Sequence, residues 1–265
     1  MTLFFLALAG FLSWIISTVS GGGGALLLTP AVGYLVGARA VAPVVTLTSL
    51  LGEPTRIYLF WKDKDIDWRV VCWYLPGATV GALFGAWVFA TARAEWLQVV
   101  VALFLISTVW QYRFGERERS CPMRAWAFLP VGFVVAFFSG LIGATGPVLN
   151  PFYLNYGAIK ERMIATKGVN SLAMHLVKIG TYTALDSLTG EYLLYGTAAG
   201  IAAAGANWVG KRWLERFSNR RFRQLAIAVM VASGATMLWT QRDTLREVWE
   251  NSTGWGTMRG RRAGS

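Results

Sequence analysis

Ten apolar segments run along the chain, separated by short polar loops, and they fall into two sets of five. The first set is Leu3–Val19, Ala25–Val36, Val41–Trp61, Val70–Ala90 and Leu97–Tyr112, and the second is Ala125–Ile142, Pro147–Tyr156, Met163–Leu185, Tyr192–Val209 and Leu225–Trp239. Most of these segments approach the ~20 residues that an α-helix needs to cross a bilayer. The pattern therefore predicts an all-α integral membrane protein.

The second segment of each set is too short to cross. The two contain 12 and 10 residues, so at ~1.5 Å per residue they reach only ~15–18 Å against a hydrocarbon core of ~30 Å. Broken segments are tolerated at membrane depth only where protein buries them or where they line a wet cavity. We therefore expect each short segment to be one arm of a re-entrant helical hairpin broken by glycine.

The two sets predict two repeats. We expect residues 1–112 to form the first repeat (hairpin 3–36, helices 41–61, 70–90 and 97–112), 113–124 a cytoplasmic linker, 125–240 the second repeat (hairpin 125–156, helices 163–185, 192–209 and 225–239), and 241–265 a mobile polar tail. Polar residues recur at one offset, since Glu53 matches His175 and Arg56 matches Lys178 (175 − 53 = 178 − 56 = 122). Two halves with matching breaks are the architecture of secondary transporters.

Composition agrees with this class. The chain is 55% hydrophobic and 15% charged, which leaves too little polar surface to cover a soluble globule. The net charge of +11 comes from short clusters between apolar runs, and not from the single basic face that nucleic-acid binding requires. Cys72 and Cys121 have no spacing for a disulfide framework or a metal site. The first segment lacks the positive n-region of a cleavable signal peptide, so we expect it to be retained.

Basic loops set the expected orientation, because Lys and Arg stay cytoplasmic. The loops Lys62–Arg69, Arg113–Arg124, Lys160–Arg162 and Lys211–Arg223 hold three, four, two and six basic residues. If each hairpin enters and leaves on one side, all four loops share the cytoplasmic face. The two hairpins then enter from opposite faces, the halves are inverted, and both termini are periplasmic. Five arginines in the last 25 residues run against this orientation, but they lie in the polar tail.

A run of four glycines, Gly21 to Gly24, separates the two arms of the first hairpin. Glycine accepts positive φ, and the helix that begins after it would direct its first N–H groups and its positive dipole end at an anion. A flexible loop or a helix-packing patch is an equally open interpretation. The run has a weaker counterpart in Gly140, Gly143 and Gly146, followed by Asn150 and Pro151.

Few ionisable side chains lie within the apolar segments, and a charge at the bilayer centre costs ~2.5–3.5 kcal/mol even on the lenient scale. We therefore expect those present to face a cavity or one another, together with three asparagines; the residues are Glu53, Arg56, Lys167, His175, Lys178, Asn150, Asn155 and Asn170. Glu53 and Arg56 are spaced i, i+3 and can pair, either at a site or merely as a lock between helices. No acidic residue lies three or four positions from Lys167 or Lys178, which favours an anion pocket.

These residues resemble the sulfite exporter TauE/SafE family, also called toluene-sulfonate uptake permeases. The resemblance rests on the glycine turn from Gly21 to Pro30, its weaker repeat from Gly140 to Pro151, and the polar pairs Thr48–Ser49 and Asn170–Ser171. It covers Leu3 to about Trp239 and implies a bacterial inner-membrane secondary transporter for small sulfur-containing anions. The second turn departs from the glycine-dense form at Ala144 and Thr145, so the two turns need not contact the substrate equally.

The expected function is therefore export of sulfite, sulfoacetate or another organosulfonate by alternating access, without a cofactor or metal. The expected substrate-binding residues are Gly21, Gly22, Gly23, Gly24, Thr48, Ser49, Arg56, Gly143, Gly146, Asn150, Lys167, Asn170, Ser171, His175 and Lys178. Lys178 is the first choice for the cation, because Glu53 can neutralise Arg56. Glu53 and His175 are candidates for H⁺ coupling, although a lone histidine is as often a packing residue.

Other interpretations stay open at this stage. They are a permease for a different small anion such as thiosulfate, and a non-transporting scaffold or assembly factor. An enzyme is disfavoured, because the chain has no HExxH or CxxC motif and one histidine leaves little for a metal site. The expected partners are the anion and the lipid bilayer, and the protein is a monomer or a homodimer.

Overall fold

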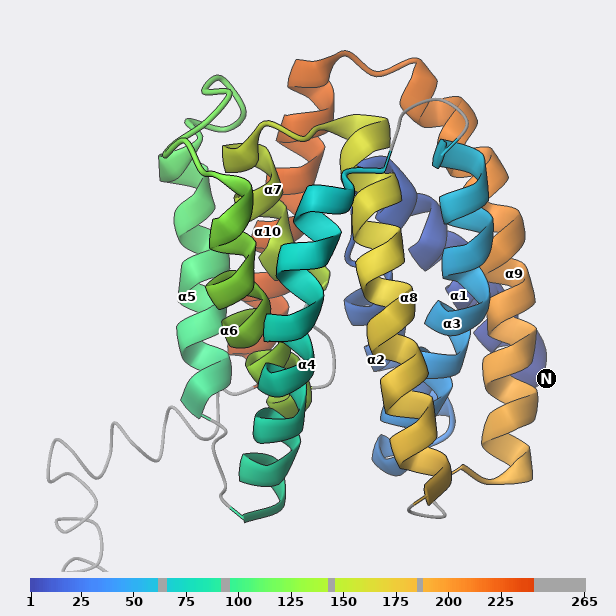
Figure 1. The fold of residues 1–265 in the computed structure, drawn as a ribbon. Helices are drawn as coiled ribbons and strands as arrows, with labels where there is room; N and C mark the ends of the chain where they lie inside the picture. The colour runs from blue at the N-terminus through green and yellow to red at the C-terminus, as the bar shows by residue number, and fades with distance from the viewer. Residues whose placement is uncertain (62–65, 92–95, 143–145, 185–187, 241–265) are drawn as a thin grey trace, which may run out of the picture.

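The computed structural model describes residues 1–61, 66–91, 96–142, 146–184 and 188–240. These residues form helices and no strands (Figure 1). The α-helices are α1 (Thr2–Ser20), α2 (Gly24–Leu35), α3 (Ala38–Trp61), α4 (Trp68–Thr91), α5 (Trp96–Gln111), α6 (Phe128–Ile142), α7 (Asn150–Tyr156), α8 (Lys160–Ala184), α9 (Gly190–Glu215) and α10 (Asn219–Thr240), with short 3₁₀ turns η1 (Ala125–Ala127) and η2 (Gly146–Leu149). The all-α prediction is confirmed, and the expected tail 241–265 lies outside the described residues.

Each predicted segment corresponds to a helix. The largest differences are that α9 continues past Val209 to Glu215 and that α10 begins at Asn219. Both extensions carry Lys and Arg, which are good helix formers and whose aliphatic stems cover apolar surface while the charge reaches water. The apolar runs therefore mark the buried length of a helix and not its ends.

The glycine run reverses the chain. Gly21, Gly22 and Gly23 have φ of 75°, 143° and 111°, values that residues other than glycine rarely adopt. The Gly22 N–H donates to the Ser17 carbonyl at 2.7 Å, which closes the end of α1 in the manner of a Schellman motif. Gly24 is already helical, and a Cβ there would lie 2.9 Å from the Ser17 Cβ. Helix α2 therefore packs back against the end of α1.

The second break is built differently. Helix α6 ends at Ile142, and the chain resumes in η2 and the short α7. The Met123 N–H, just before η1, donates to the Asn155 carbonyl near the end of α7 at 3.1 Å. The segment thus returns to the end of the molecule from which α6 started (Figure 1).

Elements from the two halves of the chain pack on each other. Helix α1 packs on α9 and α6 on α4, while α3 faces α8 and α5 faces α10. Glycines permit the closest of these approaches. A Cβ on Gly81 of α4 would lie 2.1 Å from the Phe133 carbonyl oxygen of α6, and one on Gly10 of α1 would lie 2.9 Å from the Ala199 carbonyl oxygen of α9. Small residues at membrane helix contacts serve this purpose.

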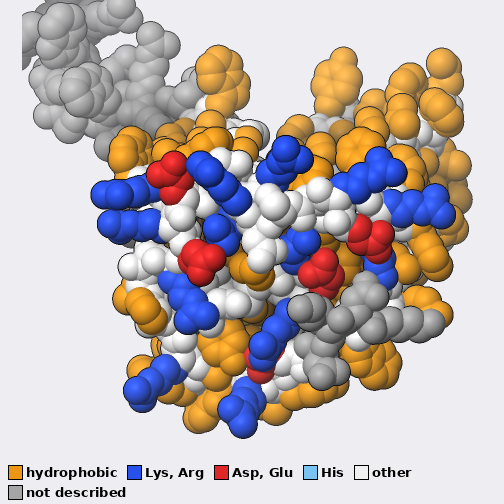
Figure 2. Space-filling model, turned by 90° about the horizontal axis from the view of Figure 1, so that it is seen from above, with side chains coloured by type: hydrophobic (Ala, Val, Ile, Leu, Met, Phe, Trp, Pro, Cys, Tyr) orange, Lys and Arg blue, Asp and Glu red, His pale blue; other side chains and the backbone are white. Residues whose placement is uncertain are grey.

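One end of the molecule is basic (Figure 2). The described parts of the four loops that are rich in Lys and Arg all lie at this end, which is the upper end in Figure 1. Ion pairs join them: Arg162 to Asp67 at 2.6 Å, Arg220 to Glu116 at 3.2 Å and Arg223 to Glu118 at 3.6 Å. We call this end the basic face, and it contains residues 66–69, 112–124, 157–162 and 215–223.

The distribution of polarity is the reverse of that in a soluble protein. Large apolar side chains are exposed on the sides of the bundle, including Phe4, Leu83 and Ile201. Charged side chains are buried inside it, with Glu53 4%, Arg56 5% and Lys167 4% exposed. Among the described residues, α1 alone is long and apolar enough to cross a membrane by composition, with a mean hydropathy of 2.0. The other long helices carry polar or small residues that face the interior.

We predict that Gly81→Ala destabilises the fold by ~1–3 kcal/mol, the usual cost of overpacking. The added methyl would meet the Phe133 carbonyl, which is part of a helix backbone and cannot turn aside. Gly205→Ala in α9 is the control, because nothing lies within 4 Å of a Cβ there and the change should stabilise the helix by up to ~1 kcal/mol. Thermal unfolding in detergent measures both, and equal midpoints would contradict the α4–α6 contact.

Candidate functional site

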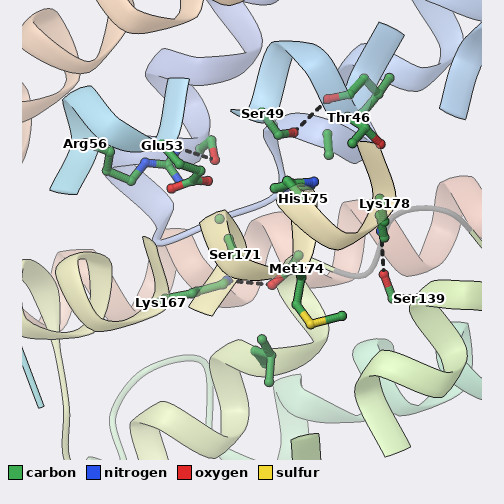
Figure 3. A pocket seen from close by; sticks show the side chains of 18 of the residues that line it. Thr46, Ser49, Glu53, Arg56, Ser139, Lys167, Ser171, Met174, His175 and Lys178 are labelled. Carbon is green, nitrogen blue, oxygen red and sulfur yellow. Dashed lines mark hydrogen bonds and ion pairs between the residues drawn. The ribbon is translucent and has the colours of Figure 1, made fainter. Parts of the chain in front are cut away.

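A cavity of about 90 Å³ lies where the two chain reversals meet α3 and α8 (Figure 3). It has room for several waters or a small anion. Eleven of the residues expected to bind substrate or couple protons line it, namely Gly22, Gly23, Gly24, Ser49, Glu53, Arg56, Gly146, Lys167, Ser171, His175 and Lys178. Segments more than a hundred residues apart in sequence therefore supply one wall.

Four other expected residues do not line the cavity. Thr48 is fully buried and donates to the Val44 carbonyl at 2.8 Å, and Asn170 donates to the Tyr153 hydroxyl at 2.8 Å. Gly21 and Asn150 lie behind the wall and reach the cavity only through Lys167. The fifth, Gly143, lies outside the described residues.

Asn155 also departs from expectation. Its side-chain oxygen accepts from the Tyr112 hydroxyl at 2.9 Å and from the Ser120 amide at 3.0 Å, at the basic face. It therefore anchors the 113–124 loop and does not face the cavity.

Glu53 and Arg56 form the predicted pair, with Arg56 Nη1 3.0 Å from Glu53 Oε1. Arg56 also donates from Nη2 to the Ser17 hydroxyl of α1 at 2.9 Å. Within the described residues, Glu53 Oε2 and Arg56 Nε are buried without a hydrogen-bond partner. The pair thus joins α3 to α1 and still has polar atoms that water or a ligand can meet.

Lys178 makes the matching contact in the second half, since its Nζ donates to the Ser139 hydroxyl of α6 at 3.0 Å. The two serines stand at the same offset as the two cations (139 − 17 = 178 − 56 = 122). Sequence reasoning missed both serines, although this offset would have found them. The Nδ1 of His175, one turn before Lys178, is buried and has no hydrogen-bond partner among the described residues.

Lys167 lines the cavity and is hydrogen-bonded to both turns. Its Nζ donates to the Gly21 carbonyl at 2.7 Å, to the Gly146 carbonyl at 2.5 Å and to Asn150 Oδ1 at 2.6 Å. The sequence predicted that both turns would offer N–H groups to an anion. Instead, both turns direct a carbonyl at Lys167, while the start of α2 (Gly23, Gly24 and Ala25) lines the cavity.

The formal charge of the cavity is positive. Arg56, Lys167 and Lys178 contribute +3 and Glu53 −1, which leaves +2 with His175 neutral. Uncompensated charge is costly in a buried site, so a bound anion would stabilise this arrangement. No cluster of His, Cys, Asp or Glu within the described residues has the arrangement of a metal site.

A family model for the sulfite exporter TauE/SafE family matches residues 6–237. The chain belongs to this family. No curated protein and no solved structure is significantly similar to the chain.

Membership in the TauE/SafE family makes the protein a membrane transporter of the sulfite-exporter type, which confirms the resemblance. The matched range includes both chain reversals and every residue of the cavity wall. Members of the family are transporters and not enzymes.

The cavity has further lining residues that the TauE/SafE resemblance did not indicate. They are Trp14, Ser17, Thr46, Tyr74, Ser139 and Met174, among others. Asn207 of α9, also missed, accepts from Thr18 of α1 at 2.7 Å and donates to the Gly52 carbonyl of α3 at 2.8 Å. Most of these are uncharged residues inside apolar runs, where single-sequence reasoning has little signal.

We predict that Arg56→Met destabilises the protein by ~3–5 kcal/mol, because it leaves the Glu53 carboxylate buried without its counter-charge. The double variant Glu53→Gln/Arg56→Met should recover at least ~1 kcal/mol relative to the sum of the single changes. Thermal or denaturant unfolding of the purified variants tests both statements. The control is Arg220→Met, whose pair with Glu116 is largely exposed and should contribute less than ~1 kcal/mol. Additive single effects would show that the buried pair contributes no coupling.

Proposed function

We propose that the protein moves a small sulfur-containing anion, such as sulfite, sulfoacetate or another organosulfonate, across the bacterial inner membrane in the export direction. The observation that carries this proposal is the buried cavity with three cationic side chains and one carboxylate. The family supplies the transporter class, and the cavity supplies a place that favours an anion.

The cavity has the donors that such an anion requires. A sulfonate carries one negative charge on three acceptor oxygens, and its desolvation must be offset by fixed donors or a cation. Trp14 Nε1, Arg56 Nε and His175 Nδ1 are buried nitrogens of lining residues that have no hydrogen-bond partner among the described residues. Lys178 Nζ lies beside Ser139. The start of α2 adds a partial positive charge of about half a unit.

We further propose that residues 1–112 and 125–240 are inverted repeats joined by the linker 113–124. Three features of the packing support this proposal: α1 on α9 corresponds to α6 on α4, while α3–α8 and α5–α10 each map onto themselves. The α3–α9 contact is more extensive than its counterpart α4–α8 and departs from this exchange of corresponding helices. The Arg56–Ser17 and Lys178–Ser139 contacts obey the exchange. Alternating access would then be the movement of one repeat against the other around the cavity.

Protonation of Glu53 or His175 is our proposal for H⁺ coupling. Glu53 Oε2 and His175 Nδ1 are both buried at the cavity and without a hydrogen-bond partner among the described residues. A proton on either atom would change the net charge that the anion meets.

The function is tested by uptake of labelled sulfite or sulfoacetate into liposomes that contain the purified protein, with binding measured by thermal shift in detergent. We predict that Lys178→Met weakens anion binding by at least ~1.5 kcal/mol, or roughly tenfold, the low end for a hydrogen bond to a charged group. Lys211→Met is the matched control, because Lys211 binds the Leu59 carbonyl near the basic face. Liposomes that move none of the anions, with no ligand shifting the midpoint, would favour a scaffold role.

The orientation that the basic loops indicate predicts that both termini are periplasmic and that the basic face is cytoplasmic. Cys121 is exposed in the 113–124 loop, so in a Cys72→Ser background it should react with an impermeant maleimide only in inside-out vesicles. A Ser265→Cys variant without the native cysteines should react in intact spheroplasts. Labelling of Cys121 from outside would reverse the topology.

A further inference from the structure

Lys167 lies where the two chain reversals touch. Its ammonium contacts the first turn through the Gly21 carbonyl and the second through the Gly146 carbonyl and the Asn150 side chain. The turns themselves are in contact, since a Cβ on Gly146 would lie 3.3 Å from the Gly23 nitrogen. Lys167 therefore joins the two hairpins, together with Asn150, whose Nδ2 donates to the Ser20 carbonyl at 3.4 Å.

Lys167 Nζ donates hydrogen bonds to three carbonyl oxygens. A protonated lysine has three N–H donors and no acceptor, so the three oxygens match its capacity. The carboxylate in the cavity, Glu53, pairs with Arg56. The positive charge of Lys167 is thus held by carbonyl dipoles, in a side chain that is 4% exposed.

Carbonyl oxygens from unwound segments are the ligands that secondary transporters direct at Na⁺ near the midplane. Here two backbone carbonyls and one amide carbonyl converge in the same way, but on a covalently attached cation. The ammonium stands where such a site would hold a dissociable ion.

The repeat offset shows that this arrangement occurs once. The position that corresponds to Lys167 in the first half is Val45 (167 − 45 = 122), a buried apolar residue. The first half therefore has no ammonium at the corresponding place.

We infer that the two turns form an internal cation site that the chain fills with its own Lys167 ammonium. This ammonium holds the turns in register, so that the neighbouring side chains meet the anion. It also replaces a dissociable metal cation at that place. The replacement of a dissociable metal cation rests on the proposed transport function, whereas the internal cation site does not.

Chemical rescue tests the site. Lys167→Ala keeps Cβ and removes the three outer carbons and Nζ, a volume that n-propylammonium matches atom for atom. We expect the variant to lose thermal stability in detergent and n-propylammonium to restore it saturably. Tetramethylammonium, a cation without N–H donors, should have no effect at equal ionic strength.

Met163→Ala is the matched control. Met163 has a side chain of similar length, lies one turn before Lys167 and is fully buried beside Gly21, so its loss leaves an apolar hole without the three oxygens. n-Propylammonium should not restore this variant. Equal responses of the two variants, or of Lys167→Ala to the two cations, would overturn the inference.

A second comparison applies if Lys167→Ala does not fold. Lys167→Val/Asn150→Leu removes the cation together with its side-chain acceptor, and it should fold in higher yield than Lys167→Val, which leaves the Asn150 oxygen without a donor. A lower yield of the double variant would count against the inference.

The claim that Lys167 replaces a dissociable metal cation is tested on the wild-type protein. Its thermal midpoint and its anion affinity should be the same in NaCl and in choline chloride. A requirement for Na⁺ would overturn the replacement of a metal cation. A failure of transport in both salts, with intact n-propylammonium rescue, would instead count against the proposed function alone.

Discussion

Charged side chains within the hydrocarbon core of a bilayer must find their hydrogen-bond and ion-pair partners inside the protein. This constraint accounts for the interior of the protein. Arg56 of α3 is held by Glu53 on its own helix and by Ser17 of α1. Lys178 of α8 is held by Ser139 of α6, and Lys167 by both turns. Because the surrounding lipid offers no hydrogen bonds, the contacts made by Arg56 with Ser17, by Lys178 and by Lys167 tie separate segments together.

The Arg56–Ser17 and Lys178–Ser139 contacts correspond at one sequence offset, but other polar positions of the two halves differ in charge. The offset of 122 pairs serine with serine and arginine with lysine, but it pairs Glu53 with His175 and Lys167 with Val45. One half therefore carries a compensated cation and the other an excess of positive charge. An anion that enters the cavity would meet an asymmetric electrostatic field.

The exterior follows from the same physics. Glycines let α4 pack directly against the backbone of α6 and let α1 pack directly against the backbone of α9. Charged side chains that cannot be satisfied inside gather at the basic face, where water and ion pairs such as Arg162–Asp67 accommodate them. The sides of the bundle are left apolar.

The sequence by itself determined the helices, the two chain breaks and eleven of the residues that line the cavity. Apolar runs must become helices in a membrane, positive φ at Gly21 to Gly23 requires glycine, and buried charges are rare enough to mark a site. The Glu53–Arg56 pair was also predictable, because it depends on spacing within one helix.

Only the tertiary structure decided what each cation touches. Lys167 is hydrogen-bonded to two carbonyls because two turns from distant parts of the chain converge on it. Asn155, which was expected at the cavity, anchors a loop at the basic face for the same kind of reason. Periodicity describes which face a side chain shares with its neighbours on one helix, but the partner of a buried charge is set by how separate helices pack.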